Sequence, residues 1–120
     1  MIEEVKMRVA LVLVAGGMLV GARMEAAEDA VTRGKRLYTE NRCTMCHSVA
    51  GKGNPKGPQD GVGAKLTPAE LRKWMLEPKA MAAKAKAERK PPMPSFETLE
   101  REELDALVAY LASLKAPPAK

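Results

Sequence analysis

Residues 43–47 read Cys-Thr-Met-Cys-His, and this run contains both cysteines and the only histidine of the 120-residue chain. Two thiols separated by two residues lie on one turn, where each can add to a vinyl group of a haem and form a thioether. The histidine that follows is then placed to bind the iron. The spacing therefore predicts covalent attachment of one haem c through Cys43 and Cys46, with His47 as an axial ligand of the iron.

Other uses of this spacing fit the chain less well. A thioredoxin-type redox pair needs strands that alternate with helices, and the sequence has no alternating β-branched run. A zinc site would need a carboxylate as its fourth ligand, which is rare in structural zinc sites. A disulfide across two residues closes too small a loop to stabilise the chain much.

The second axial ligand of the iron cannot be a histidine, which leaves Met, Lys, an amine, water or no ligand. Met93 lies in Lys90-Pro-Pro-Met-Pro-Ser-Phe96, where three prolines hold the backbone extended on both sides of one thioether. A soft sulfur held in this way suits haem iron and raises its reduction potential. The sequence therefore predicts Met93 as the second ligand; Met81 is the second candidate, and packing of Met93 in the core is the alternative.

The amino-terminal region is typical of an export signal. Residues 9–22 are apolar or glycine throughout, but this run is shorter than the roughly 20 residues that a membrane-spanning helix needs. The small residues Val20-Gly21-Ala22 offer a cleavage site. We expect a signal peptide over 1–22, with an uncleaved anchor as the alternative, and a short linker over 23–28.

The rest of the chain reads as helices and one long loop. Apolar spacing predicts a helix over 29–41 with Asp29 as its N-cap. Thr67-Pro68-Ala69-Glu70 is a capping-box sequence that begins a helix ending before Pro78.

A strongly amphipathic pattern predicts a last helix over 100–114. Glycines and prolines predict a loop over 48–64, and no convincing strand is evident. Composition favours helix over 79–90, but no continuous apolar stripe supports it, so a solvated flap is the alternative there. The expected fold is all-α.

Over residues 29–115 the chain resembles the class I monohaem c-type cytochromes of bacteria, and 116–120 would form a tail. The matching features beyond the haem motif are Gly34 and Tyr38, Leu107 and Tyr110, Gly57-Pro58, and Met93 before Pro94. The resemblance implies three to five helices wrapped around a covalently attached haem. It also implies that the Pro58 carbonyl accepts the Nδ1–H of His47. Trp74 resembles an aromatic residue that contacts a haem propionate, and ordinary packing is the alternative.

These features together predict an electron-transfer protein, exported to the periplasm, that is a monomer and not itself an enzyme. Residues 33–90 carry 14 basic and 5 acidic residues, and residues 97–105 carry five acids and one arginine. A basic surface would steer the protein toward redox partners with acidic docking surfaces. Nucleic acid is not expected as a partner. Contact with a membrane is expected only if the leader stays uncleaved. The alternatives are a cytochrome subunit of a larger oxidoreductase complex and a gas-binding sensory haem, the latter if Met93 is not a ligand.

Overall fold

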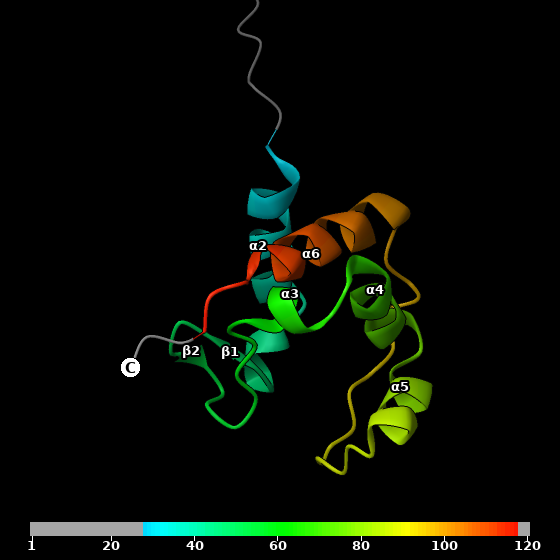
Figure 1. Cartoon of the computed structure of the whole chain (residues 1–120). Helices are drawn as coiled ribbons and strands as arrows, with labels where there is room; N and C mark the ends of the chain where they lie inside the picture. Colours follow the sequence, from blue (N-terminus) through cyan, green and yellow to red (C-terminus); the bar gives the residue numbers. More distant parts are fainter. Residues whose placement is uncertain (1–27, 118–120) are drawn as a thin grey trace, which may run out of the picture.

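The computed structural model describes residues 28–117 (Figure 1). The leader predicted over 1–22, nearly all of the linker and the last three residues of the tail lie outside them. In chain order the elements are α2 (Ala30–Glu40), the 3-10 helix η1 (Cys43–Met45), β1 (Ser48–Val49), β2 (Lys52–Gly53), α3 (Val62–Lys65), α4 (Pro68–Leu76), α5 (Pro78–Ala85) and α6 (Arg101–Ser113). Five α-helices in this part of the chain confirm the predicted all-α fold. None of these helices combines the length and apolar character needed to cross a membrane.

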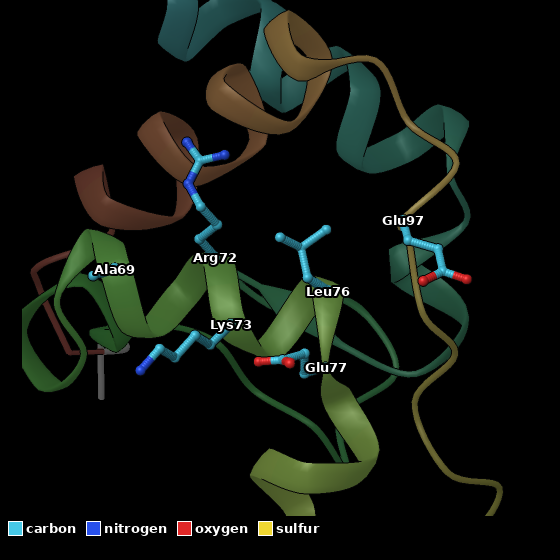
Figure 2. A pocket seen from close by; sticks show the side chains of 6 residues that line it. All are labelled: Ala69, Arg72, Lys73, Leu76, Glu77 and Glu97. Atoms are coloured by element: carbon cyan, nitrogen blue, oxygen red, sulfur yellow. The ribbon is translucent and has the colours of Figure 1, made fainter.

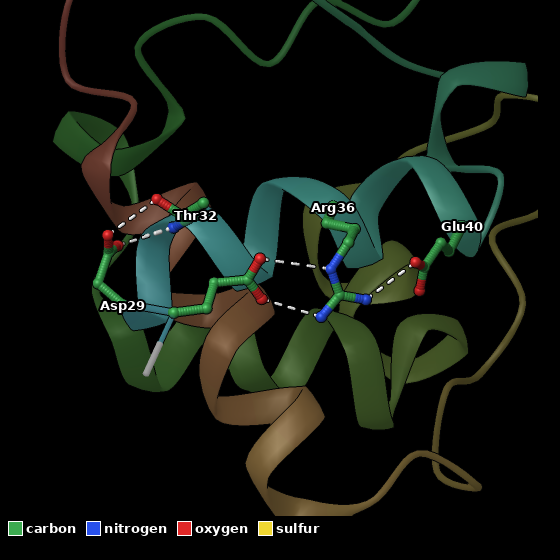
Figure 3. Close-up of polar contacts among 5 residues, drawn as sticks. Asp29, Thr32, Arg36 and Glu40 are labelled. Carbon is green, nitrogen blue, oxygen red and sulfur yellow. Dashed lines mark hydrogen bonds and ion pairs between the residues drawn. The ribbon is translucent and has the colours of Figure 1, made fainter. Parts of the chain in front are cut away.

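The first described helix, α2, begins where the sequence predicts. The Asp29 side chain accepts hydrogen bonds from the Thr32 backbone N–H and the Thr32 hydroxyl, both at 2.9 Å (Figure 3). These bonds satisfy one of the free amide groups of the first turn. One turn further on, the Arg36 guanidinium lies 2.9 Å from carboxylate oxygens of both Glu28 and Glu40. Asp29 is therefore confirmed as the N-cap of α2.

Helices α2 and α6, the two longest of the described residues, cross closely and make the most extensive contact between elements there (Figure 1). Gly34 lies at the crossing, and a Cβ built on it would overlap with the Ala106 carbonyl oxygen and lie 2.6 Å from the Tyr110 Cβ. The rings of Tyr38 and Tyr110 meet edge to face, with centroids 5.5 Å apart. Gly34 and Tyr38, two of the features that carry the resemblance, therefore meet the last helix at Ala106 and Tyr110.

The hydrophobic core is built mainly on the buried face of α6. The spacing of this face follows the helical period on which the sequence prediction rested. Two residues of α2 and two residues of α4 complete the core. The buried members are Leu37, Tyr38, Leu71, Met75, Leu104, Ala106, Leu107, Val108, Tyr110 and Leu111.

The loop predicted over 48–64 contains more regular structure than expected. Strands β1 and β2 pair antiparallel around Ala50 and Gly51, which both have positive φ, at 52° and 79°. Two successive residues in this conformation make the tight turn that suits a hairpin. The expectation of no strand is wrong for these four strand residues, because alanine at Ala50 gives no turn signal in the sequence. The short helix α3 also begins within the predicted loop.

Helices α4 and α5 follow each other with only Glu77 between them. The capping box of α4 is confirmed: Thr67 Oγ1 accepts the Glu70 N–H at 3.2 Å, and the Thr67 N–H donates to Glu70 Oε1 at 3.3 Å. Helix α5 has only Pro78 buried and packs against α4. The segment left open over 79–90 is therefore helical up to Ala85 and irregular from there on.

Candidate haem-binding site

The two cysteines lie on one tight turn that follows α2. Cys43 begins η1, and its carbonyl oxygen accepts the backbone N–H groups of Cys46, at 3.2 Å, and His47, at 2.9 Å. Both thiols are free and half-buried, while Met45 between them is 65% exposed. Burial raises the pKa of the Cys43 thiol to about 11, so this thiol is protonated at neutral pH. The turn thus presents two adjacent thiols close to the molecular surface.

The imidazole of His47 is held in one tautomer by the loop that follows. Its Nδ1 lies 3.1 Å from the carbonyl oxygen of Gly57. Because a carbonyl oxygen can only accept a hydrogen bond, Nδ1 carries the proton and donates it. The lone pair of His47 then lies on Nε2, the atom that a metal would take.

This contact corrects the role predicted for Pro58. Ser48 and Pro58 form a parallel bridge in which the Ser48 N–H donates to the Gly57 oxygen at 3.0 Å and the Gln59 N–H donates to the Ser48 oxygen at 2.8 Å. Successive carbonyl groups of extended backbone point in opposite directions. The Gly57 carbonyl consequently points toward His47, and the Pro58 carbonyl points away.

Burial and charge keep His47 neutral. Burial is the main cause of its lowered pKa, the Gly57 carbonyl acts in the opposite direction, and the positive charge of Arg89 lowers the pKa further. A neutral imidazole is the form that binds iron.

Asn54 organises the attachment turn, a role that sequence reasoning missed. Its backbone N–H lies 3.1 Å from the Thr44 oxygen and 3.0 Å from the His47 oxygen. Its side-chain Nδ2 donates to the Met45 oxygen at 3.0 Å. The position of Asn54 between a glycine and a proline is the sequence signal that indicates such a turn residue.

The segment that carries Met93 is tied to the end of α4. The Phe96 N–H donates to the Met75 oxygen at 2.8 Å, and the Ser95 hydroxyl donates to the Leu76 oxygen at 3.1 Å. Met93 is half-buried and packs against the same core cluster as Cys43. The structure therefore holds Met93 against the core, and its bond to iron stays a prediction.

The other two residues predicted to contact the haem or its iron, Trp74 and Met81, lie on helices α4 and α5. Trp74 is a half-buried residue of α4, and it is not among the side chains of the described region that pack against the core cluster. Its contact with a propionate stays a prediction. Met81, the second candidate ligand, is half-buried on α5.

A separate hollow lies along α4 and is closed on one side by Glu97 (Figure 2). Its lining mixes cations and carboxylates with two small or aliphatic side chains and holds neither cysteine nor histidine. The lining residues are Ala69, Arg72, Lys73, Leu76, Glu77 and Glu97. The Arg72 guanidinium forms an ion pair with Asp105 of α6, so this hollow is a junction between elements and not part of the attachment turn.

The attachment turn fits a covalently bound haem. Two free thiols lie on one turn. The adjacent imidazole is neutral, and its free lone pair is on Nε2. Across residues 28–117, no cluster of three or more His, Cys, Asp or Glu side chains is placed to hold a metal ion. Two thiols and one neutral imidazole on this turn are thus a donor set suited to haem attachment.

Comparison with known proteins agrees with this geometry. The sequence profile described as Cytochrome c matches residues 31–115, which is most of the chain. The chain is also 28% identical over 100 residues to cytochrome c oxidase subunit 2 of Alkalihalophilus pseudofirmus. That alignment spans 76% of this chain but only 28% of the length of that relative. With this match and a turn suited to haem attachment, the chain belongs to the cytochrome c family, whose members bind haem c covalently.

Proposed function

We propose that this protein is an exported carrier of single electrons whose haem iron is bound by His47 and Met93. The observation that carries the proposal is the contact between His47 Nδ1 and the Gly57 oxygen. This contact fixes the tautomer that leaves Nε2 for the iron, and it raises the basicity of the ligand. Haem c supplies reversible one-electron chemistry between ferric and ferrous iron when it is bound.

The support for Met93 comes from the way its segment is fixed. Pro92 and Pro94 restrict the backbone on both sides, and the hydrogen bonds of Ser95 and Phe96 to the end of α4 anchor the segment. Little conformational entropy is then lost when the thioether binds, which favours a stable sixth ligand. A filled sixth position leaves no site for a substrate, and this favours electron transfer over oxygen or peroxide chemistry.

The exposure of the attachment turn supports exchange of electrons with other proteins. Met45, between the two cysteines, is 65% exposed, so the edge of a group attached there would lie close to a docked partner. Small transient interfaces are typical of such redox encounters. The excess of basic residues over 33–90 favours partners with acidic docking surfaces.

Export and oligomeric state belong to the same proposal. The apolar leader over 1–22 supports export to the periplasm, with attachment to a membrane only if the leader stays uncleaved. We expect the protein to act as a monomer and not to bind nucleic acid.

A second candidate function is favoured by the relative named cytochrome c oxidase subunit 2. The chain matches a part of that protein, so it would serve as a cytochrome subunit of a larger oxidoreductase complex. Purification from the source membrane or periplasm distinguishes the two functions: a free carrier elutes alone, and a subunit elutes with a catalytic partner.

The test of the proposed ligation compares two haem-loaded variants. Met93→Ala removes the thioether, and we expect loss of the far-red sulfur-to-iron absorption band, a high-spin oxidised spectrum, binding of carbon monoxide and a lower reduction potential. Met81→Ala is the matched control and should leave the spectrum unchanged. If Met93→Ala keeps the band, Met93 is not the ligand; if that variant and the wild type both bind carbon monoxide, a gas-binding haem is the better account.

A further inference from the structure

The guanidinium group of Arg89 lies beside the ligand histidine. A Cβ built on Gly57 would overlap with both Arg89 Nη1 and the Cys46 carbonyl oxygen, and it would lie 3.0 Å from His47 Nδ1. These three atoms surround one point, and only the absence of a side chain at Gly57 leaves room for them. Arg89 comes from the irregular segment between α5 and Met93. The segment that carries Met93 therefore places a cation against the loop that holds His47.

Arg89 forms no ion pair with a carboxylate of the described residues. The ion pairs within residues 28–117 join Arg36 to Glu28 and Glu40, and Arg72 to Asp105. Arg89 takes part in none of them and is solvent-exposed. Its positive charge is thus screened by water and salt, and not by a fixed partner.

An uncompensated cation at this place acts on the iron through the histidine. Positive charge beside the imidazole opposes the withdrawal of electron density from it, so His47 becomes a weaker donor. The Gly57 carbonyl has the opposite effect, because it accepts the Nδ1–H and raises the basicity of the ring. A cation also disfavours the ferric state, which carries one more positive charge than the ferrous state. Both effects of Arg89 favour reduction.

We propose that Arg89 is a positioning residue that raises the reduction potential of the haem iron through its place beside His47 and Gly57. The proposal rests on the proposed function, because it needs His47 as an iron ligand.

The test compares the reduction potentials of haem-loaded Arg89→Gln, Arg89→Lys and Lys84→Gln. Lys84→Gln is the matched control, because it removes the same charge from the exposed helix α5. Arg89→Gln should lower the potential clearly more than Lys84→Gln, and Arg89→Lys should restore most of the difference. Because the group is exposed, the difference between Arg89→Gln and the wild type should shrink as salt is added.

Equal shifts of the reduction potential in Arg89→Gln and Lys84→Gln would overturn the proposal. A lowered reduction potential in an Arg89→Lys variant that keeps its far-red sulfur-to-iron band would also overturn it. If Arg89→Gln loses the far-red band, its potential no longer reports the role of the charge, and the Arg89→Lys variant is used instead. An intact band in Arg89→Lys together with a reduction potential near that of the wild type supports the proposal. The band of the wild type reports the ligation separately. Its absence would count against the proposed function, whereas an intact band with equal shifts counts only against the role of Arg89.

Discussion

At the scale of single residues, the haem site depends on a carbonyl oxygen and on the space that a glycine leaves. The Gly57 oxygen fixes the tautomer of His47, and the missing side chain at Gly57 admits the Cys46 carbonyl and the Arg89 guanidinium. The site is thus specified by backbone geometry as much as by the residues that bind haem and iron.

Gly57→Ala should accordingly disturb the site. Its Cβ would overlap with the Cys46 carbonyl oxygen, which is part of the attachment turn and cannot move freely. We expect a loss of about 1–3 kcal/mol in the free energy of unfolding, as for other overpacked positions. Denaturant unfolding of the haem-loaded protein measures this loss. Lys56→Ala, at the exposed neighbouring position, is the control and should change stability by less than about 0.5 kcal/mol; equal effects would contradict the steric argument.

At the scale of elements, the starts of the helices can be predicted from patterns of residues that are close in sequence. The contacts of the site cannot be predicted in this way. Asp29 and the Thr67 capping box are local patterns, so the starts of α2 and α4 could be predicted. The hairpin around Ala50 could not, because alanine gives no turn signal at that position and each strand is only two residues long.

The contacts of His47 join segments that are distant in the chain. Which of two adjacent carbonyls faces His47 is decided by the bridge between Ser48 and Pro58, and the approach of Arg89 by the path of the chain after α5. Residue types and spacing carry no information on either. The haem-binding turn could therefore be predicted from the sequence, but the groups that lie against the His47 ring could not.

The cap of α2 predicts a dependence of stability on pH. The Thr32 backbone N–H and then the Thr32 hydroxyl lower the pKa of Asp29 in the folded protein. Stability from this bond is therefore present above the unfolded-state pKa of about 3.9 and is lost as the pH falls through the lower folded value. The unfolding free energy of the wild type relative to Asp29→Asn should fall on acidification. A difference that stays the same from neutral to strongly acidic pH would refute this role.

The crossing of α2 and α6 predicts a second effect at this scale. Gly34→Ala adds a Cβ that overlaps with the Ala106 carbonyl oxygen, so the two helices must move apart. We expect a loss of about 1–3 kcal/mol in unfolding free energy, although alanine favours helix more than glycine does. Chemical denaturation followed by circular dichroism measures it. Lys35→Ala, on the exposed side of α2, should change stability little; a stabilised Gly34→Ala variant would contradict the close crossing.

At the scale of the whole molecule, composition and cofactor explain each other. Aromatic residues make up only 3% of the chain, and the buried side chains are mostly aliphatic. A small chain often relies on a cofactor to complete its core, and a covalently attached haem supplies a large apolar surface. The same chain keeps its basic residues mainly in 33–90 and a cluster of acids in 97–105.

This uneven charge predicts that electron transfer depends on salt. Transfer to an acidic protein acceptor should slow as ionic strength rises from about 0.01 to 0.15 M, because the screening length falls from about 30 to 8 Å. Stopped-flow kinetics at several salt concentrations measure the rate. Transfer to an uncharged small oxidant is the control and should change little. A rate to the acidic acceptor that is independent of salt would remove the steering proposal.

We propose above that the protein is a one-electron centre whose haem iron is bound by both His47 and Met93. Its most direct test is the absorption spectrum of the purified haem-loaded protein during a reductive titration. We expect a far-red sulfur-to-iron band in the oxidised form, its loss on uptake of one electron per haem, and a reduced spectrum that carbon monoxide does not change. An oxidised spectrum that is high-spin and lacks this band, with a reduced form that binds carbon monoxide, would contradict it.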